Sequence, residues 1–402
     1  MELVTVEQAV ELIIDRIQPI TKVERVPLMS ALGRVLADTM YAPMSNPPFD
    51  RSPIDGYALK ASDTKGAKKE TPIMLTVVGE VDAGHASSRV IQSGEAMRIM
   101  TGAPIPEGCD CCIRQESTDY GEEIVAIYEE MNVHDNYCDL GEDIREGSLL
   151  LHRFTKLTFV ELGILASMGI DTVPVLVRPR IALITTGDEV TPPGEKLEPG
   201  KIYNSNQTML EARMQELGIP FSVVAKVSDD PEELANLIRE LASKVDAIIT
   251  TGGVSVGKKD ILHETIKILK AQRVFWKVLL KPGTPTIFSI YNNLPIISLS
   301  GNPFGALANT ELLIRPMLDK MIPHSQLCPV RKKAIMEDEF LKESKGRRFI
   351  RGYYEDGKVK LPSMKRHSSG ILSSMIGCNC MIDICPGTKA LHKGDEVTVV
   401  LL

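Results

Sequence analysis

Apolar residues between positions 178 and 321 follow two alternating patterns. Short, nearly continuous apolar runs, such as 181–184 and 247–249, predict strands that are buried on both faces. Between such runs, apolar residues recur every three or four positions, as at Leu234, Leu237 and Leu241, which predicts amphipathic helices. Regular alternation of strands and helices predicts a doubly wound, mostly parallel sheet covered by helices on both faces.

The individual elements of this region follow from the same patterns and from capping signals. Asp229-Asp230-Pro231 places an acidic cap and a first-turn proline at the start of one helix. The predicted strands span 181–184, 221–225, 246–249, 274–280 and 295–299. The predicted helices lie around 210–217, from Pro231 to 241, over 260–270 and over 302–321.

The flanking segments have other patterns. Residues 1–45 are predicted to be helical, with a first apolar stripe that ends at Pro19, and a helix is predicted over 156–169. Residues 46–146 alternate short β-type runs with glycine and proline turns, which predicts a small antiparallel β domain inserted between two helical pieces. Residues 326–402 predict a second small β domain.

Composition narrows the classes of function. The 402 residues are 43% hydrophobic and 25% charged, which is typical of a soluble protein, and the net charge of −7 disfavours a nucleic-acid partner. No apolar run approaches the ~20 residues needed to span a membrane, so no membrane role is expected. The acidic N-terminal segment does not resemble a signal peptide, so a cytoplasmic location is expected.

The eight cysteines do not form a complete metal-ligand pattern. Cys109, Cys111 and Cys112 cluster, as do Cys378 and its neighbours, but the run from Cys109 to Cys112 has no matching histidine partner nearby. Reduced thiols buried in strands are the favoured interpretation, and a structural metal is the alternative.

Three glycine-containing turns follow predicted strands. They are Gly187-Asp188-Glu189, Thr250 to Gly257, and Ser300-Gly301-Asn302-Pro303. Glycines let the backbone approach a ligand closely, and the N–H groups of a following helix favour an anion. Because the carboxyl ends of parallel strands share one edge, we expect these turns to meet there and to bind an anionic ligand. The alternative is that each glycine turn merely packs its strand.

Charged residues near these turns suggest how an anion would be held. Asp188, Glu189 and Asp260 could converge on Mg²⁺, although Asp260 also fits a helix cap and the other two fit a solvated turn. Lys277 and Lys281 could hold phosphate or an oxyanion, with a solvated strand end as the alternative. A phosphate-binding loop of ATPases is disfavoured, because Lys259 stands where its serine or threonine should be.

Taken together, these motifs resemble the molybdopterin molybdotransferase family, which comprises bacterial MoeA and the E domains of plant and animal homologues. The resemblance covers nearly the whole chain in the same order and rests on the following motifs: Phe49-Asp50-Arg51-Ser52, Asp55-Gly56-Tyr57-Ala58, Arg98 to Pro104, Gly141-Glu142-Asp143-Ile144-Arg145, Thr186 to Val190, Gly252 to Gly257 with Asp260, Lys281-Pro282-Gly283, and Gly301-Asn302-Pro303.

The resemblance implies a multidomain α/β homodimer with four domains. These are a helical and extended dimerisation domain (1–45 with 147–177), an inserted β domain (46–146), a molybdopterin-binding domain of the MoaB/Mog type (178–325) and a small C-terminal β-barrel (326–402). It also implies an enzyme that inserts molybdate into adenylylated molybdopterin with Mg²⁺, releasing molybdenum cofactor and AMP. The pterin adenylyltransferase and the enzymes that receive the cofactor are the implied partners.

The roles of individual residues are also implied by the resemblance. The catalytic candidates are Asp55, Thr101, Asp143, Glu189 and Asp260. The Mg²⁺ candidates are Asp188, Glu189, Asp229 and Asp260. The substrate-binding candidates are Gly187, Asp188, Gly252, Gly253, Ser255, Gly257, Lys277, Lys281, Ser300, Gly301, Asn302, Pro303 and Arg351.

Three alternatives stay open at this point. Lys258-Lys259, Thr284 and Ser300 depart from the family pattern near the predicted anion site, which leaves tungstate as an alternative to molybdate. A pterin adenylyltransferase resembles residues 178–321, but the additional β domains argue against it. An interaction scaffold would need extra domains or long linkers, for which this sequence offers no candidate.

Overall fold

The computed structural model describes residues 3–254, 261–362, 368 and 370–402. The chain divides into two compact units. The sheet unit contains Met1–Glu24, Gly33–Val35 and Val175–Leu402, and the insert unit contains Arg25–Leu32 and Leu36–Pro174. The division into four domains stays a prediction.

A six-stranded sheet forms the centre of the sheet unit, in the order β13-β10-β14-β18-β17-β15. The first four strands are parallel, and β17 runs antiparallel to both β18 and β15. The strands are β10 (Ile181–Thr186), β13 (Val223–Val227), β14 (Ala247–Thr251), β15 (Gln272–Trp276), β17 (Ile287–Tyr291) and β18 (Leu294–Leu299). The mostly parallel sheet predicted from the sequence is confirmed.

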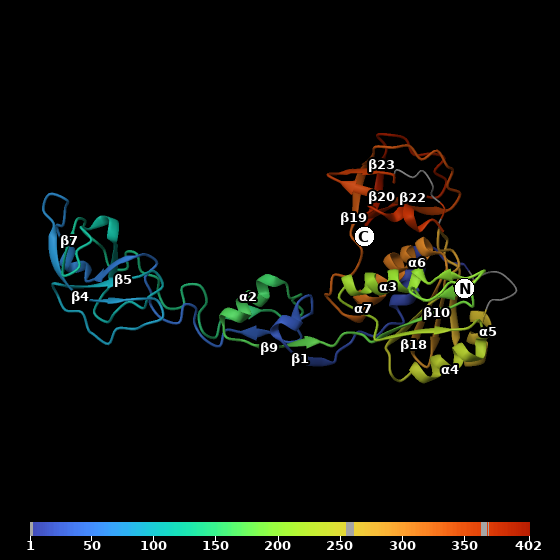
Figure 1. Ribbon diagram of the computed structural model, residues 1–402, viewed down its shortest axis with the longest axis horizontal. Coiled ribbons are helices and arrows are strands. Elements are labelled where there is room, and N and C mark those ends of the chain that lie inside the picture. The colour runs from blue at the N-terminus through green and yellow to red at the C-terminus, as the bar shows by residue number, and fades with distance from the viewer. Residues whose placement is uncertain (1–2, 255–260, 363–367, 369) are drawn as a thin grey trace. The chain divides into compact units, whose positions relative to one another are not determined.

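Helices cover both faces of this sheet (Figure 1). On one face, α4 and α5 pack on a buried apolar cluster that includes Ile184, Ile248 and Ile296. On the other face, α3 contacts α6, which continues through a π-helical turn into α7. The helices are α3 (Ser205–Glu216), α4 (Pro231–Leu241), α5 (Ile261–Leu269), α6 (Pro303–Asn309), η4 (Thr310–Ile314) and α7 (Arg315–Met321).

The start of α4 follows the predicted capping. The Asp230 side chain accepts hydrogen bonds from the N–H groups of Glu232 and Glu233, at 2.8 and 3.3 Å, and Pro231 is the first helical residue. Because these N–H groups have no partner within the helix, the cap satisfies donors that the helix itself leaves open.

The C-terminal strands close into a small barrel, as predicted. Strand β20 pairs with β21 and β22, β21 with β19, β19 with β23, and β23 with β22, which completes the ring. The short strand β16 (Leu280–Lys281) adds to β20 in parallel. The barrel strands are β19 (Arg331–Met336), β20 (Arg347–Glu355), β21 (Lys358–Lys360), β22 (Cys380–Ile384) and β23 (Glu396–Leu401).

The insert unit contains a five-stranded sheet in the order β6-β3-β5-β4-β7. All pairs are antiparallel except β4 with β5, so the sheet is mixed, where a purely antiparallel one was expected. Helix α2 (Phe159–Ser167) ends at Gly169, as predicted, with a φ of 70° at that glycine. The strands are β3 (Gly56–Leu59), β4 (Ile73–Val81), β5 (Glu95–Ile99), β6 (Cys111–Arg114) and β7 (Ile124–Ile127).

The prediction that residues 1–45 are helical is wrong beyond the first stripe. Helix α1 (Val6–Ile14) is followed by β1 (Val23–Pro27), a 3-10 turn η1 (Leu28–Ala31) and β2 (Met40–Tyr41). Strand β1 pairs with β9 (Thr172–Leu176), and β2 with β8 (Leu149–Leu151). Pairing with strands more than one hundred residues away overrides the local pattern here.

All eight cysteines are unpaired thiols. Burial raises the pKa of Cys112 to about 11 and that of Cys109 to about 12, so both thiols are protonated at neutral pH. None of the described residues forms a group of three or more histidine, cysteine or acidic side chains suited to a metal ion. Within the described part of the chain, no helix is long and apolar enough to cross a membrane.

Candidate functional site

Three loops meet at the carboxyl edge of the sheet. Strands β10, β14 and β18 are adjacent and parallel, so the loops that follow them leave the sheet on the same side. Strand β15 is antiparallel to β17, which is antiparallel to β18, so β15 also ends at this edge. We call the loops 187–189, 251–254 and 300–303 the rim loops.

Direct contacts hold the rim loops together. The N–H of Gly252 donates to the carbonyl oxygen of Leu299 at 3.3 Å. The side-chain amide of Asn206, at the start of α3, donates to Thr251 Oγ1 at 3.0 Å and to the carbonyl of Gly301 at 2.9 Å. One buried asparagine therefore links the ends of β14 and β18, and the expected convergence of the loops is observed.

The backbone of the middle rim loop requires glycine. Gly252 has a φ of 97°, and a Cβ atom there would lie 2.3 Å from the carbonyl oxygen of Thr186. Gly253 has a φ of 64°, and its Cβ would lie 2.8 Å from a side-chain carbon of Ile261. Both the conformation and the close approach of β10 therefore exclude a side chain. The predicted residues Ser255, Gly257 and Asp260 lie outside the described residues.

Two buried polar atoms at the rim have no hydrogen-bond partner among the described residues. They are Thr186 Oγ1 and Asn206 Oδ1, in side chains that are buried at the ends of β10 and α3. A buried polar atom without a partner costs about 1–3 kcal/mol, and such atoms are a recognised feature of functional sites. Thr186 Oγ1 lies against the glycine loop, 2.8 Å from where a Cβ of Gly252 would stand. A polar ligand or water would satisfy such an atom.

Carboxylates gather beside this loop. The N–H of Asp229 donates to Asp188 Oδ1 at 3.2 Å, and the N–H of Asp188 lies 3.5 Å from Asp229 Oδ2. The carboxylate of Glu189 folds back over Gly187, within 2.7 Å of where a Cβ would stand. None of the three carboxylates forms an ion pair within the described part of the chain. Their negative charge is therefore available to a cation.

A side-chain hydrogen bond of Ser300 stabilises the third rim loop. Its Oγ accepts the N–H of Asn302 at 3.2 Å, and Pro303 is the first residue of α6. The serine that departs from the family pattern thus contributes a local turn.

The two predicted lysines lie on different sheets: Lys277 follows β15, the edge strand of the central sheet, and Lys281 lies in β16, which joins the barrel sheet. Lys277 follows β15 with a φ of 72°, and its ammonium lies 4.0 Å from the centre of the Trp276 ring. Lys281 in β16 pairs with Arg348 of β20 and lines a cavity of about 990 Å³ together with Phe340.

Arg351 is almost fully buried on β20 and packs against the rim. Its guanidinium carbon lies 4.1 Å from the centre of the Phe304 ring, directly after the third rim loop. Its Nη2 donates to the carbonyl of Ser368 at 3.0 Å, while Nε has no partner among the described residues. Burial lowers the pKa of this guanidinium, since desolvation disfavours its charged form.

The predicted residues of the insert unit fall into two groups. Asp55 Oδ1 accepts hydrogen bonds from both the N–H and the hydroxyl of Thr101, each at 2.7 Å. These bonds, with the backbone donor the stronger influence, lower the pKa of Asp55. Asp143 instead accepts a bond from the Asn46 side chain at 3.2 Å. Asp55 and Thr101 are thus brought together, and Asp143 has a different partner.

Sequence reasoning missed Asn206 and Trp276. Asn206 stands in a short polar run before a helical pattern, and nothing local distinguishes it from a capping residue such as Asn204, which caps α3. Trp276 precedes Lys277 in the sequence, but adjacency alone does not predict that the lysine packs on the ring. Asn206 contacts Thr251 and Gly301, which are 45 and 95 positions away in the chain, so no short stretch of sequence indicates these contacts.

This arrangement defines a class: a doubly wound α/β protein whose glycine loops and carboxylates gather at the carboxyl edge of the sheet, with two additional β modules. Residues 4–169 match the MoeA N-terminal region (domain I and II), residues 182–320 a probable molybdopterin binding domain, and residues 333–402 the MoeA C-terminal region (domain IV).

Individual relatives agree with these matches. The chain is 34% identical over 389 residues to a molybdopterin molybdenumtransferase of Bacillus subtilis (strain 168), covering 94% of this chain and 90% of the relative. It is 31% identical to the same-named protein of Staphylococcus aureus (strain COL), covering 99% and 95%. A crystal structure of the molybdopterin biosynthesis MoeA protein from Pyrococcus horikoshii OT3 matches with a TM-score of 0.81, 30% identity and full coverage of both chains.

The chain belongs to the MoeA family of transferases in molybdenum cofactor biosynthesis. This confirms the family, the fold class and the enzyme class predicted from the motifs. The roles of the individual residues stay predictions.

Proposed function

We propose that this enzyme inserts molybdate into adenylylated molybdopterin, cleaving the adenylate and releasing molybdenum cofactor and AMP. The observation that carries the proposal is the convergence of the rim loops, with uncompensated carboxylates on one side and Lys277 on the same sheet edge. Cleavage of a phosphoanhydride needs charge neutralisation and positioning more than covalent help, and this edge supplies both.

The rim loops would bind the pterin end of the substrate. The close approach that Gly252 and Gly253 permit lets backbone N–H groups reach a phosphate. The buried oxygens of Thr186 and Asn206 would accept hydrogen bonds from the amino and ring N–H groups of a pterin. Ser300 and Asn302 would close the loop on the opposite side.

The carboxylates fit Mg²⁺ by their chemistry. Asp188, Glu189 and Asp229 are oxygen donors without a cation partner among the described residues, and Asp188 and Asp229 lie on adjacent loops linked by hydrogen bonds. Mg²⁺ prefers a few carboxylates together with ligand phosphates, and it would neutralise the charge of the adenylate. Asp260 is proposed as a further ligand.

Cationic residues would hold the oxyanion. Lys277 and Lys281 are proposed to contact molybdate as point charges, and Arg351 to support it from the barrel. Asp55, Thr101 and Asp143 are proposed to be catalytic. The hydrogen bonds from Thr101 lower the pKa of Asp55 and stabilise its carboxylate form, which is the form that would bind a cation.

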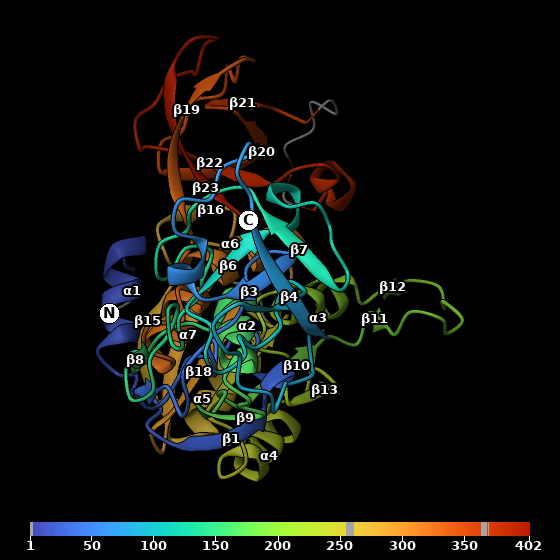
Figure 2. The ribbon, with the colours of Figure 1, turned by 90° about the vertical axis from the view of Figure 1, so that its left-hand side faces the viewer.

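AMP release tests the proposal. Purified protein is incubated with adenylylated molybdopterin, Mg²⁺ and molybdate, and AMP and molybdenum cofactor are measured. Glu189→Gln should abolish release, because it removes a charge from the carboxylate group. Glu195→Gln is the matched control, since Glu195 is exposed in the arm that carries β11 (Val190–Thr191) and β12 (Ile202–Tyr203) (Figure 2). Full activity of Glu189→Gln would contradict the assignment.

Two further arms of the experiment separate the alternatives. Replacing molybdate by tungstate tests whether this enzyme prefers the heavier oxyanion. Supplying ATP and free molybdopterin tests for adenylylation, which would indicate a pterin adenylyltransferase.

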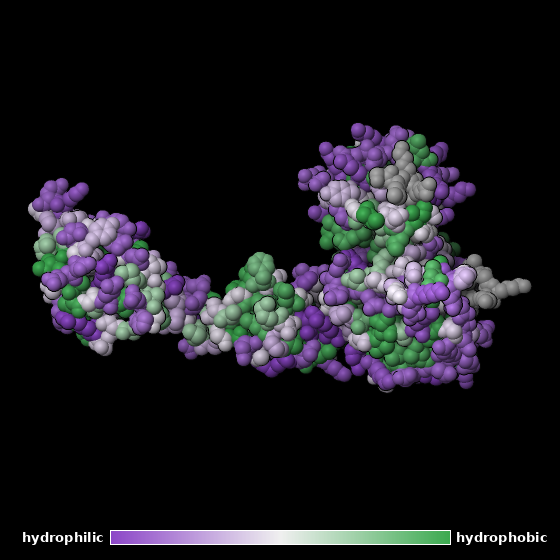
Figure 3. Space-filling model, viewed as in Figure 1, coloured by the Kyte–Doolittle hydropathy of each residue, from purple (hydrophilic) through white to green (hydrophobic). Residues whose placement is uncertain are grey.

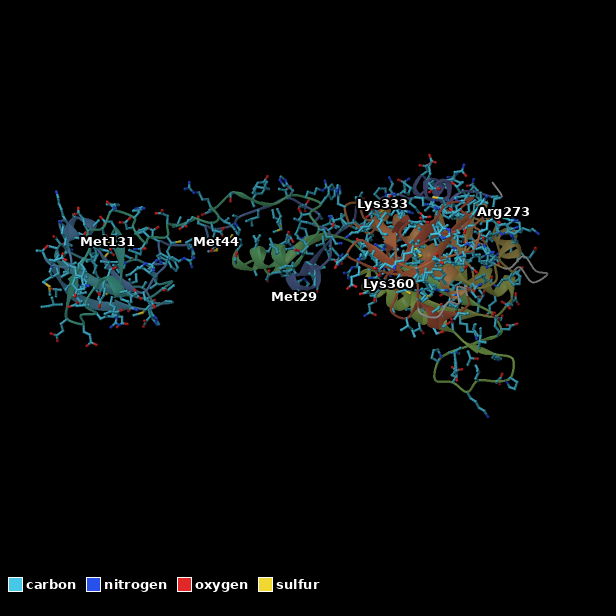
Figure 4. The ribbon with its side chains drawn as sticks, turned by 90° about the horizontal axis from the view of Figure 1, so that it is seen from above. Met29, Met44, Met131, Arg273, Lys333 and Lys360 are labelled. Atoms are coloured by element: carbon cyan, nitrogen blue, oxygen red, sulfur yellow. The ribbon has the colours of Figure 1, made fainter. Side chains whose placement is uncertain are left out.

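We also propose that the enzyme is a cytoplasmic homodimer that exchanges pterin with the adenylyltransferase and with cofactor-receiving enzymes. Large apolar side chains are exposed on the insert unit around α2 and η1, which contact one another. Phe159 is 80% exposed and Met29 is 78% exposed. Figure 3 shows apolar surface over the segment that carries α2, and Met29 is labelled in Figure 4. Such an exposed apolar surface is typical of a subunit interface.

A further inference from the structure

The end of strand β15 places an aromatic ring beside a proposed oxyanion ligand. Trp276 pairs with Ile287, which pairs with Ser298 at the carboxyl end of β18, so Trp276 stands level with the base of the third rim loop. Lys277 leaves the strand immediately afterwards, with its N–H donating to the carbonyl of Thr286 at 2.9 Å. The backbone of the lysine is thereby held at the edge of the sheet.

The Trp276 ring contacts cations and the helix that follows the glycine loop. The Lys277 ammonium lies 4.0 Å from the ring centre, well within the range of a cation–π interaction. The His263 ring on α5 meets the indole edge to face, with ring centres 4.5 Å apart, and the Arg273 guanidinium lies 5.9 Å from the indole centre. The indole thus connects α5 to the lysine.

The Trp276 indole contacts the Lys277 ammonium through its ring face. Its Nε1 is buried and has no hydrogen-bond partner within the described part of the chain, so donation of a hydrogen bond does not explain its placement. The Lys277 ammonium forms no ion pair among the described residues, and its positive charge is therefore not neutralised. A flexible lysine loses up to about 2 kcal/mol of rotamer entropy when it is ordered, and a ring that orders it beforehand reduces this cost on binding.

We propose that Trp276 is a positioning residue that holds the Lys277 ammonium ready for an incoming tetrahedral oxyanion dianion. A dianion attracts the ammonium more strongly than the ring quadrupole does, so binding shifts the ammonium relative to the indole. Since Trp276 is the only tryptophan of the chain, its fluorescence reports this movement. The inference rests on the proposed function, in which Lys277 contacts molybdate.

Steady-state kinetics with molybdate test the positioning role. Trp276→Leu is expected to raise the KM for molybdate about two- to thirty-fold, the equivalent of a cation–π interaction of ~0.5–2 kcal/mol, with a smaller effect on kcat. Trp276→Phe keeps an aromatic face and should restore most of the affinity. Phe275→Leu is the control for packing, because Phe275 lies on the same strand as Trp276 but faces Phe288 of β17, and no cation–π contact joins it to Lys277 among the described residues. Thermal unfolding of each variant establishes that it is folded.

Fluorescence titration provides a readout that does not depend on turnover. Wild-type protein titrated with sodium molybdate should show a saturable change in tryptophan emission, absent with sodium chloride at equal ionic strength. Lys277→Met should abolish the change.

The outcomes separate the two proposals. Equal increases in KM for the leucine and phenylalanine variants, an increase no larger than that of Phe275→Leu, or a wild-type emission unaffected by molybdate would each overturn the positioning role. If the wild type releases no AMP, the proposed function fails, and the titration alone then decides whether Trp276 and Lys277 form an oxyanion site.

Discussion

Substitution of Gly252 by alanine tests whether the close contact between β10 and the glycine loop sets the geometry of catalysis. The new Cβ would lie 2.3 Å from the carbonyl oxygen of Thr186 and 2.8 Å from its Oγ1. The first of these atoms belongs to the backbone of a central strand, which cannot rotate away. The loop must therefore move by about 1 Å before the contact becomes ordinary.

The expected loss of activity follows from this displacement. A misplacement of about 1 Å in a substrate-holding element costs about 10²-fold in rate, so kcat for AMP release should fall by about that factor. The φ of 97° at Gly252 adds about 1–3 kcal/mol of backbone strain, which lowers the unfolding midpoint as well.

The control separates strain from displacement. Gly357 in the turn between β20 and β21 also has a positive φ, of 78°, but no atom lies within 4 Å of its would-be Cβ. Gly357→Ala should therefore lower stability with little effect on kcat. A folded Gly252→Ala protein with wild-type kcat would refute the view that the rim loops hold the substrate in a fixed geometry.

Three other predictions follow from the structure. Glu311→Gln should lower the free energy of unfolding by about 3–5 kcal/mol in urea titrations, because this fully buried carboxylate neutralises two largely buried arginines. Thr101→Val should raise the pKa of Asp55 toward its ordinary value, measured by NMR titration, because the hydroxyl that stabilises the carboxylate is lost while the backbone donor remains. Phe159→Glu should convert the expected dimer to monomer in light scattering, because it places a charge on the exposed apolar surface of α2.

Each of these predictions has a control or an outcome that would contradict it. Glu216→Gln removes an exposed partner of the same arginine network and should change stability by less than about 1 kcal/mol. For Asp55, a folded-state pKa below the ordinary value means that its stabilising contribution is present at neutral pH and is lost as the pH falls through that lowered pKa. An unchanged Asp55 pKa in Thr101→Val would contradict the role of the hydroxyl. An unaltered mass for Phe159→Glu would exclude α2 as the interface.

The elements predicted best were those with local signals. The Asp230 cap and Pro231 define the start of α4 from adjacent residues, and the apolar runs of β10, β14 and β18 are continuous enough to indicate buried parallel strands. The sequence analysis did not predict strand β17. The Asn292-Asn293 pair that follows it forms a turn with positive φ angles, as is typical of a hairpin. The single strand predicted over 274–280 is broken at Lys277, whose left-handed backbone no apolar pattern reveals.

The candidate site likewise has parts that could be predicted from the sequence and parts that could not. The glycine turns and their carboxylates could be located from the sequence, because each follows a recognisable strand and parallel strands share a carboxyl edge. The contacts of Asn206, the stacking of Arg351 on Phe304 and the distance from Lys277 to its neighbouring ring could not.

The sequence by itself determined the alternation of parallel strands and helices in the central sheet, the positions of the glycine turns and, through its motifs, the family. The tertiary structure alone decided which side chains meet: Asn206 reaches Gly301 because α3 packs over the sheet, and Arg351 reaches Phe304 because the barrel packs on α6. The physical reason is that local patterns encode backbone conformation and burial over a few residues. Contacts between distant residues depend on strand register and on the packing of whole elements, which no short stretch of sequence specifies.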